Sequence, residues 1–162
     1  MAKPAKAPVP EGMHTITPHL WFNGEAAAAL DLYQRAFGAE VVGDVAKGPD
    51  GKSVMHAMLR FGTSHVMIAD AWPGNWERGP TDAATAGLWV YVNDCDALFR
   101  RAAAAGCEVT MPVADMFWGD RMGKLKDPYG HTWAIATHKE VLTPEEIHER
   151  EQAWLRSMQG GG

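Results

Sequence analysis

Residues 20–41 read LWFNGEAAAALDLYQRAFGAEV, and residues 88–109 read LWVYVNDCDALFRRAAAAGCEV. The two stretches align at an offset of 88 − 20 = 68 residues, with Leu-Trp at the start, a shared Leu inside and Gly shortly before Glu-Val at the end. Ile68-Ala69 and Ile135-Ala136 continue the match at an offset of 67 residues. The sequence therefore predicts one structural module written twice, with Trp21 and Trp89 at equivalent positions.

Each copy has the same predicted order of elements. It begins with an extended segment rich in β-branched and aromatic residues, at 14–23 and at 87–93. A helix follows, which stops at Gly38 in the first copy and runs from the N-cap Asp94 to Gly106 in the second. Further short strands are predicted at 40–46, 53–61, 65–70, 108–110, 122–126 and 132–138. Each copy should thus fold as βαβββ, which predicts the α+β class.

The domain organisation follows from the repeat. We expect a flexible tail at 1–12, a single domain at 13–140 with modules at 13–71 and 86–138, and a C-terminal helix at 143–158. Thr143, Pro144 and Glu146 give this helix a capping box with proline at the first helical position. Its apolar stripe, which includes Trp154, is expected to pack against the domain or a second subunit.

Composition and charge narrow the classes of partner and compartment. Lys and Arg number 15 against 20 Asp and Glu, a formal charge of −5, which disfavours nucleic-acid binding because duplex readers need clustered cations. Cys95 and Cys107 form no Cys-x-x-Cys pair, so they are interpreted as packing residues in a reducing compartment. No run approaches eighteen apolar residues, so we predict no membrane partner and a cytoplasmic protein.

The segments LDLYQRAFGAEV, VNDCDALFRRAAAAGCEV and WGDRMGKLKDPYGHTWAIATH carry a family resemblance. They resemble the vicinal oxygen chelate superfamily, which contains glyoxalase I, extradiol dioxygenases and the fosfomycin and bleomycin resistance proteins, and they are most similar to its PhnB-like branch. The resemblance covers residues 13–150 and implies that two modules pair, within or between chains, as a curled mixed sheet forming a half-open cup. We also expect a homodimer, which would cover the apolar sheet edges and the Trp-bearing connection at 71–86. That connection is interpreted as a lid or a dimer contact.

The resemblance also implies a divalent metal in the cup, held by four ligands that are usually His or Gln, Glu, His and Glu. The corresponding positions are Gly87 and Ala134 in the second module, and Met67 with either Thr17 or His19 in the first. Gly, Ala and Met offer no nitrogen or carboxylate oxygen to such a cation. We therefore predict no metal at the usual site, and no cofactor.

Strand alternation indicates what lines the cup instead, because residues two apart share a face. The inward positions are His19, Trp21, His65, Met67, Ala69, Trp89, Tyr91, Thr132, Ala134, Ala136 and His138. This apolar, aromatic lining suits a flat organic ligand better than a cation. The three histidines could alternatively rebuild a metal or acid–base site, or serve as ordinary hydrogen-bonded strand residues. His56 could reach the mouth of the cup or be a half-exposed strand residue.

Asp120 and Arg121 follow an aromatic turn that holds Phe117 and Trp118. Arg121 could bind a ligand carboxylate or phosphate, and Asp120 could orient it or act as a base. The competing interpretation is an intramolecular ion pair that shapes the turn. In the Asp-Pro-Tyr-Gly-His segment at 127–131, the tyrosine and the histidine are interpreted as turn residues.

We therefore predict a small-molecule-binding protein that sequesters a flat aromatic ligand in an apolar cup without a metal. The alternative is an enzyme, a lyase, isomerase or oxygenase, that acts on such a compound without metal or through a rebuilt histidine site. The predicted ligand-binding residues are His19, Trp21, His56, Met67, Trp89, Tyr91, Phe117, Trp118, Asp120, Arg121 and His138.

Overall fold

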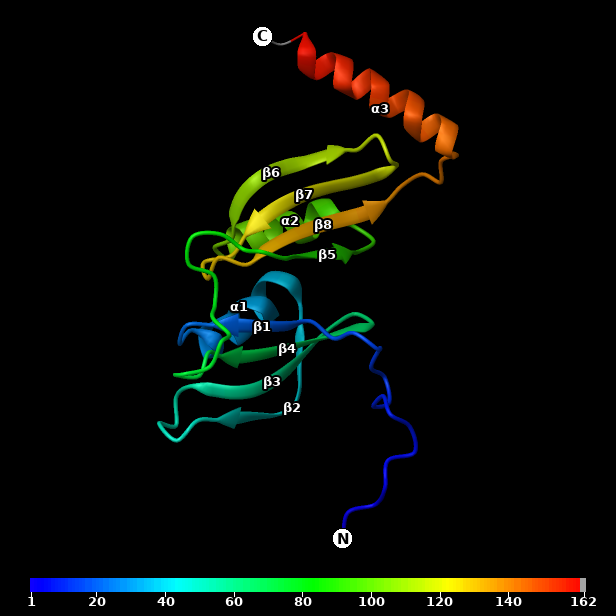
Figure 1. Ribbon diagram of the computed structural model, residues 1–162. Helices are drawn as coiled ribbons and strands as arrows, with labels where there is room; N and C mark the ends of the chain where they lie inside the picture. The colour runs from blue at the N-terminus through cyan, green and yellow to red at the C-terminus, as the bar shows by residue number, and fades with distance from the viewer. Residues whose placement is uncertain (161–162) are drawn as a thin grey trace. The chain divides into compact units, whose positions relative to one another are not determined.

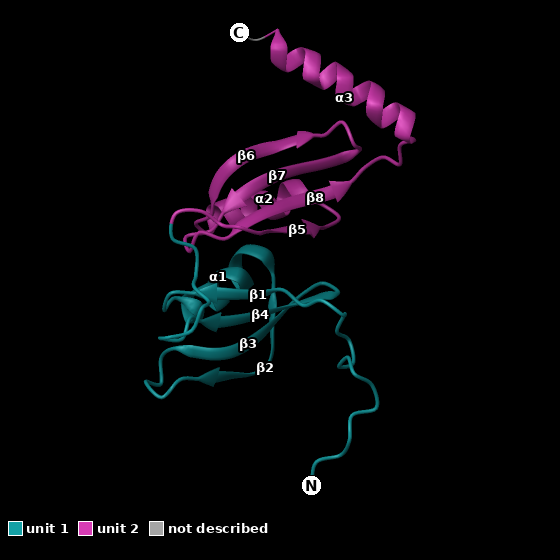
Figure 2. Ribbon diagram, in the orientation of Figure 1, with its two compact units in different colours: residues 1–81 teal, residues 82–162 magenta. Residues whose placement is uncertain are grey.

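The computed structural model describes residues 1–160, and the chain forms two compact units that divide between Thr81 and Asp82 (Figure 2). The first unit contains β1 (His19–Phe22), α1 (Ala26–Phe37), β2 (Glu40–Lys47), β3 (Val54–Phe61) and β4 (Ser64–Asp70) (Figure 1). Its strands form a four-stranded sheet in the order β1-β4-β3-β2. β1 runs parallel to β4, and the other neighbours are antiparallel.

The second unit repeats this topology. It contains β5 (Gly87–Tyr91), α2 (Cys95–Ala104), β6 (Glu108–Asp115), β7 (Asp120–Lys126), β8 (Thr132–His138) and the terminal helix α3 (Pro144–Gln159). The strand order is β5-β8-β7-β6, again with one parallel pair. The predicted α+β class, with two βαβββ modules and a C-terminal helix, is confirmed.

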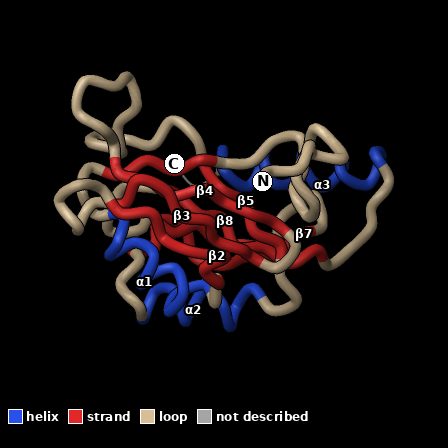
Figure 3. Tube along the Cα trace, turned by 90° about the horizontal axis from the view of Figure 1, so that it is seen from below, coloured by secondary structure: helices blue, strands red, loops and turns tan. Residues whose placement is uncertain are grey.

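In each unit a helix covers one face of its own sheet (Figure 3). The ring of Tyr33, on α1, lies 6.2 Å from that of Phe22 on β1 and 6.4 Å from that of Phe61 on β3. As predicted, α1 ends at Gly38, whose φ of 67° is a conformation that L side chains rarely adopt. α2 begins at Asp94, whose carboxylate accepts a hydrogen bond from the amide of Ala97 at 3.0 Å. We call the other face of each sheet, on the side away from α1 or α2, the open face.

The bounds of several strands differ from the sequence prediction, most of all in β6, β7 and β1. β6 continues to Asp115 instead of ending at Thr110, and its pairing with β7 shifts between Val109 and Met111 and again between Met111 and Ala114, where Pro112 lies. Proline lacks an N–H group but is tolerated at a bulge on an edge strand, which is where β6 lies. β7 begins at Asp120, two residues before the prediction, and β1 is limited to His19–Phe22 because only these residues pair with β4.

Two buried aspartates fix the ends of strands by accepting hydrogen bonds. Asp70 accepts from the amides of Gly24 and Ala26 before α1 and from the amide of Val54 at the start of β3. Asp127 is 1% exposed. It accepts from the amides of Tyr129 and His131 and from the indole N–H of Trp133 at 3.0 Å. The prediction that Tyr129 and His131 belong to a turn is thereby confirmed.

The helix α3 has the predicted capping box. The Thr143 hydroxyl accepts from the amide of Glu146, and the Glu146 carboxylate accepts from the amide of Thr143. No side chain of α3 among the described residues is buried, so its apolar residues remain accessible. It contacts the rest of the second unit through the rings of Trp154 and Phe117, 5.6 Å apart, and through a bidentate ion pair of Arg150 with Glu140.

Candidate functional site

The open face of the second sheet gathers side chains from three neighbouring strands. Trp89 lies opposite Ala134, and Tyr91 lies opposite Ala136 in the parallel β5–β8 ladder. In the antiparallel β7–β8 ladder, Met122 lies opposite Ala136, and Asp120 lies opposite His138. The period-two alternation of strands puts all of these residues on one side, as the sequence predicts for those of β5 and β8.

The apolar part of this face has a buried floor and an aromatic wall, which consists of Trp89, Tyr91 and Trp118. Met122, Ala134 and Ala136 are buried, and Met111, Met116 and Trp118 pack against them. The ring of Trp89 lies 6.3 Å from that of Trp118 and 6.3 Å from that of Tyr91. Trp89 and Tyr91 nevertheless remain 44% and 60% exposed. Large aromatic side chains that are fixed against a floor and left open to solvent are typical of a binding surface.

Asp120 connects this wall to a polar centre. Its side chain is 3% exposed. One carboxylate oxygen, Oδ2, accepts hydrogen bonds from the hydroxyl of Tyr91 at 2.8 Å and from the indole N–H of Trp118 at 3.0 Å. The other, Oδ1, lies 2.8 Å from Nδ1 of His138. Asp70 and Asp127 hold mainly backbone amides, whereas the three partners of Asp120 are all side chains on or beside the open face.

The hydrogen bonds decide the charge of this centre. Burial by itself would raise the pKa of Asp120, but the bonds from His138, Tyr91 and Trp118 outweigh burial and bring that pKa below its ordinary value. The bond to Asp120, aided by desolvation, raises the pKa of Tyr91. At neutral pH the structure therefore holds an aspartate anion surrounded by donors. Because a carboxylate has no hydrogen to donate, Nδ1 of His138 must carry one.

The turn at 116–119 positions the side chains of Trp118 and Asp120. The amide of Met116 donates to the carbonyl of Asp120 at 2.7 Å, and the amide of Gly119 donates to the carbonyl of Met116 at 3.1 Å. The carbonyl of Gly119 accepts from the amides of Lys139 and Glu140. Gly119 has a φ of +97°, and a Cβ there would lie 2.5 Å from the carbonyl oxygen of Glu140. A glycine is therefore required between Trp118 and Asp120.

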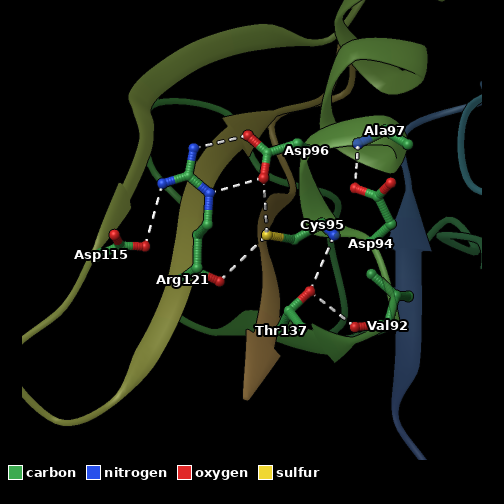
Figure 4. Close-up of polar contacts among 8 residues, drawn as sticks. All are labelled: Val92, Asp94, Cys95, Asp96, Ala97, Asp115, Arg121 and Thr137. Carbon is green, nitrogen blue, oxygen red and sulfur yellow. Dashed lines mark hydrogen bonds and ion pairs between the residues drawn. The ribbon is translucent and has the colours of Figure 1, made fainter. Parts of the chain in front are cut away.

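Arg121 lies on the opposite face from Asp120, toward α2 (Figure 4). Its guanidinium donates two hydrogen bonds to Asp96, at 2.7 and 2.8 Å, and one to Asp115 at 3.1 Å. These bonds raise the pKa of Arg121. The ion-pair interpretation of Arg121 is thus confirmed, although its partners are Asp96 and Asp115 and not Asp120. Strand alternation places Asp120 and Arg121 on opposite sides, so they do not act together.

The open face of the first sheet carries the predicted ligand-binding residues His19, Trp21, His56 and Met67. His19 and Trp21 stack with ring centroids 4.2 Å apart, and His19 lies opposite Met67 in the β1–β4 ladder. Burial lowers the pKa of His19, and the nearby His56 lowers it further, against an opposing effect of Glu77. His56 itself is an exposed residue of β3, as one of its two interpretations holds. These residues share a sheet face as predicted.

The sheet registers correct the equivalence of Trp21 and Trp89. Trp21 lies opposite Ala69, whereas Trp89 lies opposite Ala134. Ala69 corresponds to Ala136 in the repeat, and Tyr91 lies opposite Ala136. Tyr91 therefore occupies the place of Trp21, and the predicted equivalence is wrong by two residues. Both indoles still lie on the open faces, because a two-residue displacement preserves the side of a strand.

The same displacement chooses between the two candidate positions for the first metal ligand. An offset of 91 − 21 = 70 residues relates Gly87 to Thr17, and not to His19. The four positions are then held by Thr17, Met67, Gly87 and Ala134, which supply no imidazole and no carboxylate. Such a set does not fit the divalent metal of the superfamily. Among residues 1–160, no three His, Cys, Asp or Glu side chains are grouped so that they could hold a metal ion.

The cysteines have the packing role that the sequence predicts. Cys95 and Cys107 are both buried and unpaired with each other. The thiol of Cys95 lies 3.3 Å from the carbonyl oxygen of Arg121 (Figure 4). Burial raises the pKa of Cys107 to about 11, so its reactive thiolate form is scarce near neutral pH.

The sequence predicts Tyr91, Trp118, Asp120 and His138 individually as ligand-binding residues, but it does not predict that they form one network. Two signals pointed to it. Asp120 is the first residue of β7 and His138 is the last residue of β8, so the antiparallel register places them opposite each other. In addition, an aspartate at the first residue of a strand on an apolar face requires donors, and the nearby aromatic residues carry an O–H and an N–H.

Residues 14–135 match the Glyoxalase/Bleomycin resistance protein/Dioxygenase superfamily, and the chain belongs to this family. Protein Mb0911c of Mycobacterium bovis (strain ATCC BAA-935 / AF2122/97) is 38% identical over 137 residues, which cover 82% of this chain and 88% of that protein. The anthracycline biosynthesis protein DauV of Streptomyces sp. (strain C5) is 32% identical over 126 residues, covering 71% of this chain and 45% of DauV. The solved structure of a PhnB protein from Bacillus cereus matches the fold with a TM-score of 0.62 at 22% identity, covering 76% and 99% of the two chains.

The family match confirms the predicted superfamily, and the PhnB structure shows the same fold. Within residues 1–160, none of the helices has the length and apolar character that crossing a membrane requires.

Proposed function

We propose that this protein binds and sequesters a flat aromatic small molecule on the open face of its second sheet, without a metal ion. The observation that carries the proposal is the exposed pair Trp89 and Tyr91, held against Trp118 over a buried floor of methionine and alanine. Stacking on such rings contributes about 0.5–1.5 kcal/mol per aromatic contact beyond the area buried. Phe117, beside Trp118, is proposed as a further contact of this ligand. His19, Trp21, His56 and Met67 are proposed as a separate set of ligand contacts on the open face of the first sheet. The ion pairs of Arg121 occupy its guanidinium, so it is no longer proposed as a ligand contact.

The relatives support a ligand of this shape. DauV is described as an anthracycline biosynthesis protein, and anthracyclines are flat fused-ring compounds. The chain spans less than half of the length of DauV, so this proposal uses only the flat ring shape of anthracyclines. The residues at the metal positions of the superfamily supply no imidazole and no carboxylate, which supports the proposal that the ligand binds without a metal ion.

Titration with anthraquinone-2-sulfonate, a flat tricyclic probe, tests this function. Wild-type protein is expected to bind it, with quenching of tryptophan fluorescence, and a chelator should leave the affinity unchanged. Trp89→Ala should weaken binding by about 2 kcal/mol, roughly thirtyfold, when measured by calorimetry. Trp76→Ala is the matched control, because Trp76 lies in the 71–86 connection and is 97% exposed. Equal affinities for the two variants, or binding that requires an added divalent ion, would contradict the proposal.

An enzyme acting on the same ligand is the second candidate. The pair of Asp120 and His138 favours it, because an imidazole oriented by a carboxylate is a common general base. Incubation of the protein with hydroxylated aromatic compounds, followed by chromatography and mass spectrometry, distinguishes the two functions. Recovery of unchanged ligand supports sequestration, and a product that forms with turnover supports catalysis.

We also propose that the protein is a homodimer. Exposed apolar side chains support this assembly, namely Trp72 and Trp76 in the 71–86 connection and Trp154, Leu155 and Met158 on α3. Sedimentation velocity at micromolar concentration is expected to give twice the mass of one chain. A species with the mass of one chain across that range would refute the dimer.

A further inference from the structure

The hydrogen-bond pattern of His138 leaves one ring nitrogen for a ligand. Nδ1 carries its hydrogen toward the Asp120 carboxylate, so in the neutral ring Nε2 has a lone pair. The side chain of His138 is 56% exposed, and residues 1–160 contribute no hydrogen bond to Nε2. This nitrogen is therefore an accessible acceptor whose orientation is fixed by a buried anion.

One carboxylate, that of Asp120, holds both this acceptor nitrogen and the aromatic wall. Tyr91 and Trp118 donate to the same carboxylate that holds His138, and both pack against Trp89. On the open face, His138 follows Ala136, the residue opposite Tyr91, by two positions. A flat ligand that stacks on the wall thus lies beside a proton acceptor, and the rings and the acceptor are fixed by one carboxylate.

We infer that His138 accepts the proton of a phenolic hydroxyl on the bound aromatic ligand, so that hydroxylated arenes are the ligand class of this site. The O–H bond of the phenol breaks, its proton forms the Nε2–H bond, and the oxygen keeps the electron pair. The products are a phenolate and an imidazolium, and no other reactant is needed. Asp120 is a positioning residue, which orients the ring and stabilises the imidazolium charge. This inference rests on the proposed function.

The surrounding charges favour this transfer. The titratable and charged groups around His138 are Asp120 and Tyr91, Lys139, the Glu140–Arg150 pair and the Arg121–Asp96 pair. Glu140 and Asp96 are each bonded to an arginine, and Arg121 lies on the other face. Asp120 is consequently the anion closest to the imidazole, and its negative charge at hydrogen-bond distance attracts the positive charge that the transfer places on the ring.

Two sulfonated anthraquinones test the inference. Alizarin red S carries phenolic hydroxyls and changes colour when they ionise, whereas anthraquinone-2-sulfonate lacks them. Both are titrated into wild-type protein in the presence of a chelator, which prevents colour changes caused by metal binding to the probe. At a pH below that of free ionisation, the phenolate-to-phenol ratio of bound alizarin red S is expected to be about ten times that of the free dye, equivalent to about one pKa unit.

The variants separate proton acceptance from stacking. His138→Gln should abolish the colour shift while anthraquinone-2-sulfonate still binds within about twofold of wild type, since a neutral amide is not a base. Asp120→Asn should reduce the shift, because the buried charge that stabilises the imidazolium is removed. His148→Gln is the matched control, because His148 lies on α3 with a side chain that is 70% exposed, and it should retain the full shift.

The outcomes distinguish the two proposals. If anthraquinone-2-sulfonate binds but bound alizarin red S keeps the ionisation ratio of the free dye, the role of His138 is wrong and the aromatic site stands. A colour shift that persists in His138→Gln also overturns that role. If neither dye binds the wild-type protein, both proposals are wrong.

Discussion

Replacing Asp127 with alanine is expected to lower the free energy of unfolding by about 3–5 kcal/mol, a large part of the stability of an ordinary domain. The carboxylate is buried and accepts from the amides of Tyr129 and His131 and from the indole of Trp133. Alanine would leave these donors without that acceptor. Trp133 is itself 1% exposed, so its indole N–H could not turn to water instead. Urea denaturation followed by circular dichroism would measure the loss.

Asp50→Ala is the matched control for this prediction. Asp50 also sits in a turn between two strands, and it accepts from the amides of Lys52 and Ser53 and from the hydroxyl of Ser53. Its turn is exposed, so water can replace the lost acceptor, and we expect a much smaller loss of stability. Equal denaturation midpoints for the two variants would show that burial of the Asp127 network is not what stabilises the second unit.

Replacing Gly119 with alanine is expected both to destabilise the second unit and to abolish aromatic binding. A non-glycine residue at a φ of +97° costs about 1–3 kcal/mol. In addition, the new Cβ would lie 2.5 Å from the carbonyl oxygen of Glu140, so the backbone must move. That movement would displace Trp118 and Asp120, the neighbours of Gly119, and with them the Trp89 contact and the His138 hydrogen bond.

Gly106→Ala separates the two effects. Gly106 has a φ of +118°, and no atom lies within 4 Å of a Cβ placed on it. It therefore carries the backbone strain without the collision, in the turn that follows α2. We expect Gly106→Ala to lower the urea midpoint less than Gly119→Ala and to leave the affinity for anthraquinone-2-sulfonate unchanged. Loss of binding in both variants would mean that general destabilisation, and not displacement of the turn, removes the site.

The predicted helices and strand faces followed from local patterns. Gly38 ends α1 through its backbone conformation, and Asp94 begins α2 through its side chain; neither effect depends on the rest of the chain. Trp89, Tyr91 and His138 share a face because strand side chains alternate with a period of two. The fold class and much of the aromatic face could therefore be predicted without coordinates.

The pairing between strands could not be predicted in the same way. The offset of 68 residues is correct for Glu40 and Glu108 at the start of β2 and β6, which form ion pairs with Arg60 and Lys126. The ladders nevertheless place β5 two residues away from the position that this offset gives it. A displacement of two residues keeps every side chain on its face, so the hydrophobic pattern contains no information that would detect it.

By itself, the sequence determined the repeated module and its α+β class, because these depend on residue type and local spacing. Only the tertiary structure decided the role of each charged side chain. Arg121 meets Asp96 across 25 positions of the chain, and Asp120 meets Tyr91 across 29 positions and His138 across 18. Burial then makes Asp127 a structural acceptor of mainly backbone donors, while Asp120 orients side chains at the open face. The difference is physical, because a buried carboxylate takes its function from the donors that surround it, and those donors come from distant strands.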